Sequence, residues 1–144
     1  MFNFFKKKNK GLEVDAVVDG TVMPITDVND DVFSTKMLGD GFAIKPNDTQ
    51  IYAPVAGTIS TLFPTKHAIG IKTDEGLEIL IHLGLDTVEL KGAPFTVDVK
   101  QGDKVEQGQP LATMDFKQIT DKGYDDSCIV VYTNMDMVKS VTPV

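Results

Sequence analysis

The chain of 144 residues carries 21 acidic and 14 basic residues, and every basic residue is a lysine, so the net charge is −7. An acidic chain without arginine lacks both the positive surface that binds nucleic acid and the guanidinium group that usually clamps phosphate. The single cysteine, Cys128, excludes an internal disulfide and a zinc site built from thiolates. This cysteine usage suits the reducing cytoplasm, and the length fits one domain with one hydrophobic core.

The first segment, 1–12, places three phenylalanines ahead of a group of lysines. This order is the reverse of a signal peptide, and the apolar part is far too short to span a bilayer. We expect a flexible tail that touches an anionic membrane surface weakly at most. A single domain over 13–144 is expected to follow it.

Short apolar segments bounded by Gly, Pro, Asn or Asp recur along this domain and predict β-strands. The predicted strands cover 13–18, 20–24, 41–45, 50–53, 57–63, 67–73, 77–83, 95–97, 110–115 and 128–133. Helical turns are predicted at 30–37, 116–122 and 135–140, each too short to form a core by itself. This spacing predicts an all-β fold, an antiparallel β-sandwich or flattened barrel.

The two histidines of the chain, His67 and His82, fall on neighbouring predicted strands. The polar segment 73–76 between these strands contains a glycine and predicts a hairpin turn. With a loop of two or four residues, paired positions add up to 149. His67 then lies opposite His82, with Cβ atoms roughly 4.5–5.5 Å apart. A three-residue loop would pair His67 with Leu83 and send the imidazoles to opposite faces, so the expectation depends on the register.

Both faces of this predicted hairpin are largely apolar. In the expected register, one face carries the two histidines with Ile69, Ile71 and Leu80. One face can join the core, and the other would form an exposed apolar surface around the imidazoles, which is typical of a docking site.

Two histidines without a thiol cluster are too few for a self-contained zinc site unless carboxylates complete it. The chain also lacks the Gly-x-Ser-x-Gly motif, a reactive-cysteine motif and a Walker-type phosphate loop. The chemistry that remains possible is nucleophilic attack by one imidazole on a phosphoryl group. The second imidazole would donate a hydrogen bond to the charge that develops. The alternative at this point is that both histidines are structural residues of the sheet, without a chemical role.

Four segments in order carry a resemblance to a known family: Leu-Gly-Asp-Gly-Phe-Ala-Ile-Lys-Pro at 38–46, Ala-Pro-Val-Ala-Gly-Thr-Ile at 53–59, the stretch 65–70, and Ile-His-Leu-Gly-Leu-Asp-Thr-Val-Glu-Leu-Lys-Gly at 81–92. Over 14–136 the chain resembles the glucose-type enzyme IIA (EIIA) component of the bacterial phosphoenolpyruvate-dependent sugar phosphotransferase system. The resemblance implies a fold of the barrel-sandwich hybrid type. It also implies a phosphotransferase component with a phosphohistidine intermediate.

The resemblance also implies roles for individual residues. His82 would accept the phosphoryl group, His67 would stabilise it, and Thr65 would orient His67. Asp30 and Asp86 match acidic positions at the rim of the site. An apolar docking ring is implied at Val32, Phe33, Met37, Leu38 and Phe63.

In this family the phosphocarrier protein HPr donates the phosphoryl group, and a cysteine of the IIB domain of a sugar permease receives it. Arginines would then come from the partner. No cofactor is required, although zinc shared by His67, His82 and a partner's carboxylate is implied. A regulatory module of the same fold, which binds other proteins through this face, is the alternative function.

The chain departs from the family pattern after Asn134-Met135-Asp136, where a closing strand is expected to be missing or shortened. Two rival classes share some features. The segment 102–111 suggests a lipoyl or biotinyl carrier, but Asp115-Phe116-Lys117 lacks the methionine or valine that flanks a modified lysine. A zinc peptidase would need a His-x-His pair and a further ligand, which the sequence lacks.

Overall fold

The computed structural model describes residues 12–138 and 141. The expected tail at 1–12 therefore falls almost entirely outside the described residues, as does the end of the helical turn expected at 135–140. No helix in the described part of the chain is long and apolar enough to cross a membrane.

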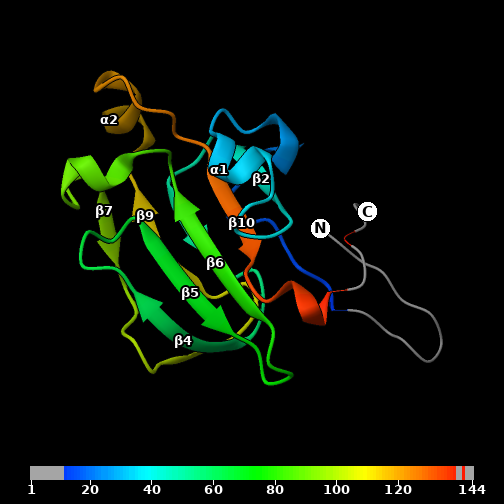
Figure 1. Cartoon of the computed structure of the whole chain (residues 1–144). Helices are drawn as coiled ribbons and strands as arrows, with labels where there is room; N and C mark the ends of the chain where they lie inside the picture. Colours follow the sequence, from blue (N-terminus) through cyan, green and yellow to red (C-terminus); the bar gives the residue numbers. More distant parts are fainter. Residues whose placement is uncertain (1–11, 139–140, 142–144) are drawn as a thin grey trace.

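Ten strands in the described residues pair antiparallel and build two sheets (Figure 1). The strands are β1 (Gly20–Pro24), β2 (Gly41–Pro46), β3 (Gln50–Tyr52), β4 (Gly57–Leu62), β5 (Ala68–Lys72), β6 (Glu78–Leu83), β7 (Phe95–Val97), β8 (Lys104–Val105), β9 (Pro110–Met114) and β10 (Cys128–Tyr132). The larger sheet has the order β1-β2-β10-β6-β5-β4-β8, and the smaller has the order β3-β9-β7. Short helices lie between them: α1 (Asp31–Ser34), α2 (Phe116–Asp121) and the 3-10 turns η1 (Ile25–Asp27), η2 (Thr87–Leu90) and η3 (Met135–Met137).

The main core lies between the two sheets. Ile69 of β5 and Ile81 of β6 reach it from the larger sheet, and Ile51 of β3 and Leu111 of β9 reach it from the smaller sheet. All four side chains are fully buried. An antiparallel sandwich with few short helices is what the strand spacing predicts, and the fold class is confirmed.

A smaller apolar cluster lies on the outer face of the larger sheet. Ile25 of η1 and Phe33 of α1 pack there against Ile129 and Val131 of β10. This cover explains why all five residues of β10 are buried, since the strand has protein on both of its faces. Figure 1 shows α1 lying over β2 and β10, beside the end of β6.

One predicted strand is absent, one predicted helical turn is shorter than expected, and one short strand was not predicted. Residues 13–18 form no strand, because only isolated hydrogen bonds hold them, such as the one from Tyr52 N–H to the Val17 carbonyl (2.7 Å). The helical turn expected over 30–37 is present but shorter, as the single turn α1, capped by the Asp30 carboxylate, which accepts from Val32 N–H at 2.9 Å. It is followed by Lys36 in the left-handed region at φ 62°. The two-residue strand β8 is too short to leave a pattern in the sequence.

The register of the histidine hairpin was also wrong. Paired positions add up to 150, so His82 pairs with Ala68, and Leu80 pairs with Gly70. The cause is a three-residue loop, closed by hydrogen bonds between Thr73 and Leu77. Consequently Ile69 and Ile71 point into the core rather than onto the face of His82. The outer face carries the smaller Ala68 and Gly70 instead.

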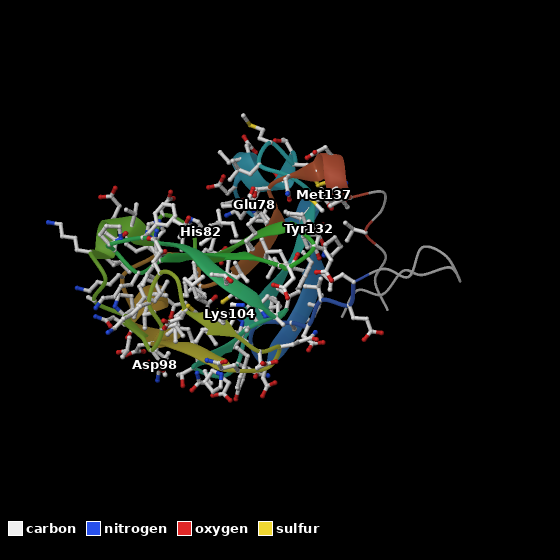
Figure 2. The ribbon with its side chains drawn as sticks, turned by 90° about the horizontal axis from the view of Figure 1, so that it is seen from below. Glu78, His82, Asp98, Lys104, Tyr132 and Met137 are labelled. Atoms are coloured by element: carbon white, nitrogen blue, oxygen red, sulfur yellow. The ribbon has the colours of Figure 1, made fainter. Side chains whose placement is uncertain are left out.

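The absence of a closing strand stays a prediction. The last element in the described residues is η3, and Asn134 just before it accepts through Oδ1 from the Glu78 N–H at the start of β6 (2.8 Å). In the view of Figure 2, Glu78 lies between His82 and Met137.

Candidate functional site

The two imidazoles meet, although the register expected from the sequence was wrong. Their ring centroids are 5.1 Å apart, with an angle of 76° between the planes. His82 is the fifth residue of β6, whereas His67 precedes β5 by one residue. Because His67 lies outside the regular strand, the alternation of side chains in a strand does not decide which face it occupies.

A tight turn after β4 directs His67 to the outer face. Lys66 N–H donates to the Phe63 carbonyl at 2.8 Å, and Lys66 adopts a left-handed φ of 62°. A lysine rarely adopts this conformation, so the turn is held by its surroundings. Thr65 Oγ1 lies 2.5 Å from Nδ1 of His67 and fixes the ring. When the hydroxyl donates this hydrogen bond, the proton of the neutral His67 ring is on Nε2.

His82 is held by a backbone carbonyl. Its Nδ1 lies 2.7 Å from the carbonyl oxygen of Gly84. A carbonyl can only accept, so Nδ1 carries the proton and Nε2 of the neutral ring keeps a free lone pair. The loop that presents this carbonyl is fixed by Thr87, whose hydroxyl donates to the Leu83 carbonyl at 2.5 Å.

Two phenylalanines enclose the pair of imidazoles. The Phe33 ring lies 5.1 Å from that of His82, and the Phe63 ring lies 5.2 Å from that of His67. His67 is only 7% exposed, whereas His82 is partly exposed. Phe33 is 5% exposed, so it forms a wall of the site rather than an exposed part of the docking ring.

Burial lowers the pKa of both histidines. For His67, the neighbouring His82 lowers the pKa further, because two positive charges would repel each other. For His82, burial outweighs three opposing influences, namely the Gly84 carbonyl and the carboxylates of Asp30 and Asp86. Both rings are therefore neutral at pH 7, which leaves a nitrogen lone pair available for chemistry.

The rim of the site combines exposed apolar side chains with acidic ones. The exposed apolar residues that the sequence pointed to are Val32, Met37, Leu38 and Phe63, of which Met37 is 74% exposed. Asp30 and Asp86 lie near enough to act on the charge of His82. Val88, two residues after Asp86, is a further exposed apolar side chain that the sequence analysis did not single out.

The residues of this site do not form a complete metal centre. Among residues 12–138 and 141, no group of three or more His, Cys, Asp or Glu side chains could hold a metal ion. His67 and His82 together offer two nitrogen ligands, and tetrahedral zinc needs more. A zinc ion at this site would therefore need ligands beyond these two imidazoles.

Comparison with known proteins agrees with this geometry. The family described as "phosphoenolpyruvate-dependent sugar phosphotransferase system, EIIA 1" matches residues 12–138. The chain belongs to this family. It is therefore an EIIA domain, a phosphotransferase component of that system, and the resemblance seen in its sequence is confirmed.

Two curated relatives are much longer than this EIIA domain. The glucose-specific EIICBA component of Streptococcus pneumoniae is 53% identical over 129 residues, which cover 90% of this chain and 18% of that protein. The β-glucoside-specific EIIBCA component of Bacillus subtilis is 49% identical over 127 residues, which cover 88% of this chain and 21% of that protein. The chain thus spans only a minor part of these two relatives.

A solved structure supports the fold. The glucose permease IIA from Mycoplasma capricolum superposes with a TM-score of 0.86 at 42% sequence identity. The superposition covers 97% of this chain and 94% of that one. The sandwich described above is therefore the fold of an EIIA protein.

Proposed function

We propose that this EIIA domain carries a phosphoryl group on Nε2 of His82. Phosphorylated HPr would donate the group, and a cysteine of a sugar-permease IIB domain would receive it. The observation that carries this proposal is the hydrogen bond from Nδ1 of His82 to the Gly84 carbonyl (2.7 Å). It selects the tautomer in which Nε2 is the nucleophile, in a ring that burial keeps neutral.

The transfer needs no net movement of protons. The lone pair on Nε2 of His82 attacks phosphorus as the phosphorus–nitrogen bond to the donor imidazole breaks. The leaving imidazole keeps that electron pair. The His82 ring becomes positively charged, and its Nδ1 proton stays in the hydrogen bond to Gly84, whose carbonyl dipole stabilises the charge.

His67 supplies the group that stabilises the phosphoryl oxygens. With Thr65 donating to Nδ1, the Nε2–H of His67 is a donor on a ring centred 5.1 Å from that of His82. A fixed donor stabilises the charge that develops during transfer without having to reorganise. Thr65 thus acts as a positioning residue, and His67 as the catalytic group.

The surface around the site suits transient partners. The exposed side chains of Val32, Met37 and Leu38 provide a small apolar area, and Asp30 and Asp86 add negative charge at its rim. Because the chain contains no arginine, the cations that neutralise a phosphoryl group in transit would come from the partner. A small apolar contact with charged edges favours fast exchange between two partners.

The two long relatives support a partner of the IIB type, since their names combine A with B and C components in one protein. One is named for glucose and the other for β-glucosides, so this domain alone does not define a sugar. With one cysteine, Cys128, the chain can form no internal disulfide, which suits the reducing cytoplasm where we place the protein.

The test is incubation with phosphorylated HPr, followed by mass spectrometry. We expect one acid-labile phosphoryl group on the wild-type domain and none on His82→Gln. The matched variant His67→Gln should still accept the group but should pass it to a IIB domain slowly. A phosphoryl group that persists on His82→Gln would reject the assignment.

A further inference from the structure

We propose that Lys45, Asp125 and Ser127 clamp the loop that follows β6 and thereby position His82 for phosphoryl transfer. The clamp acts on the Gly84 carbonyl, which holds Nδ1 of His82. The inference rests on the proposed function, but its main test below does not require phosphate.

The first link is a single peptide unit between Gly84 and Leu85. Its carbonyl accepts from His82 Nδ1 at 2.7 Å, and its N–H donates to the Asp125 carbonyl at 2.9 Å. A peptide unit is planar, so its carbonyl and its N–H move together. Any shift of the Asp125 carbonyl is therefore passed directly to the imidazole.

A second backbone hydrogen bond reinforces this link. Gly84 N–H donates to the Ser127 carbonyl at 2.8 Å. The loop 84–85 is thus tied at both of its N–H groups to the segment 125–127, which leads into β10. Figure 1 shows β10 between β2 and β6, so this segment lies between the strand that carries Lys45 and the strand that carries His82.

Side chains fix the conformation of the segment 125–127. Oδ1 of Asp125 accepts from the N–H of Ser127 at 2.8 Å and from its hydroxyl at 2.6 Å. Lys45 Nζ lies 2.6 Å from Oδ1 of Asp126 and 3.5 Å from Oδ1 of Asp125. Ser127 is only 1% exposed, and Asp126 is 4% exposed. The segment therefore has little freedom while these contacts last.

Lys45 and Asp125 each keep their charge at neutral pH, because each shifts the pKa of the other away from neutrality. Burial alone would lower the pKa of Lys45, but the hydrogen bond and the charges of the two aspartates outweigh it and raise the pKa. Burial alone would raise the pKa of Asp125, but hydrogen bonds from Ser127 and the charge of Lys45 outweigh it and lower the pKa. The ion pair of Lys45 with Asp125 adds little net stability, because both side chains are partly exposed and solvent screens their attraction. Its position beside the Gly84 peptide gives it a different role.

The test compares Lys45→Met and Asp125→Ala with the wild-type protein. Long-range proton–nitrogen NMR of the unphosphorylated protein reports the tautomer of His82, and single-turnover phosphorylation by HPr reports the rate. We expect both variants to show more of the Nε2–H tautomer of His82. The rate at saturating HPr should fall about tenfold or more, whereas the half-saturating HPr concentration should change less than about twofold.

Two further variants separate positioning from general damage. Lys104→Met removes an exposed lysine of β8, at the far edge of the same sheet, and should change neither the tautomer nor the rate. Lys45→Arg keeps the positive charge and should retain most of the rate. Lys45 is itself exposed, but Lys45→Met leaves the buried carboxylate of Asp126 without its cation. Asp125→Ala keeps the contact between Lys45 and Asp126, so it is the second variant that tests the clamp if Lys45→Met does not fold.

The clamp is rejected if folded Lys45→Met shows the wild-type tautomer of His82 at the wild-type rate. It is also rejected if the half-saturating HPr concentration rises alone, because that result would make Lys45 a docking residue. Equal losses in Lys45→Arg and Lys45→Met would rule out a role for the charge. If the wild-type domain accepts no phosphoryl group from HPr, the proposed function fails, while the tautomer measurement still decides the clamp.

Discussion

Replacing Gly84 with alanine probes the loop that presents the carbonyl group to His82. Gly84 has a φ of 81°, a conformation that residues with a Cβ rarely adopt. An added Cβ would lie 2.4 Å from Cγ2 of Thr87 and 3.0 Å from the carbonyl oxygen of Asp125. Thr87 cannot turn away freely, because it is fully buried and its hydroxyl is bound to the Leu83 carbonyl. The loop itself must therefore shift.

The structure contains a control with almost the same backbone. Gly108 has a φ of 85°, but an added Cβ there would meet nothing within 4 Å. The left-handed conformation costs roughly 1–2 kcal/mol for alanine. Overpacking adds about 1–3 kcal/mol at a crowded site. We therefore expect Gly108→Ala to lose roughly 1–2 kcal/mol of stability and Gly84→Ala to lose roughly 2–5 kcal/mol.

Urea denaturation of both variants measures these losses from the transition midpoints, provided that the slopes agree with the wild-type slope. Gly84→Ala should also slow phosphoryl acceptance, because the shifted loop moves the carbonyl away from His82. Gly108→Ala should accept the group at the wild-type rate. Equal losses of stability in the two variants would refute the reasoning from contacts at Gly84.

Three further predictions concern the site and its rim. Thr65→Val removes the hydroxyl that orients His67, so transfer to a IIB domain should slow roughly tenfold or more while acceptance from HPr continues; a wild-type transfer rate would count against this role. Burial lowers the pKa of His82 below its ordinary value of 6.5, so the acidic limb of a pH–rate profile for acceptance should lie below pH 6.5. As the pH falls through 6.5, His82 is protonated in the unfolded chain before it is protonated in the folded protein, so the free energy of unfolding should decline there too. An acidic limb of the rate profile above pH 6.5 would contradict the burial argument. Met37→Thr should raise the half-saturating HPr concentration several-fold without slowing saturated transfer, whereas Val22→Thr, an equally polar change at an exposed position on β1, should leave both unchanged.

The sequence predicted the pair of histidines, but not the way they meet. Strand alternation and a short loop led to direct opposition of His67 and His82, whereas a three-residue loop shifts the register by one position. The rings still come together because the left-handed Lys66 redirects the chain before β5 begins. A positive φ at a lysine leaves no signal in composition or periodicity, so this turn could not be read from the residues alone.

Other parts of the site have no local pattern at all. The Gly84 carbonyl is a backbone group, so no side chain in the sequence indicates that it binds an imidazole. Lys45 and Asp125 are 80 positions apart and meet only because β10 inserts between β2 and β6. Phe33 reads as an exposed contact in the sequence, yet the single turn of α1 packs it against His82. By contrast, Met37 and Leu38 were expected at the docking surface from the family resemblance, and both side chains are exposed.

The central claim is that His82 is prepared for transfer by the hydrogen bond between its Nδ1 and the Gly84 carbonyl. Long-range proton–nitrogen NMR before and after phosphorylation tests this claim most directly. We expect the Nδ1–H tautomer of His82 in the free protein and phosphorus coupled to Nε2 of the same ring afterwards. A free protein with its proton on Nε2, or a phosphoryl group on Nδ1 of His82 or on His67, would contradict the account.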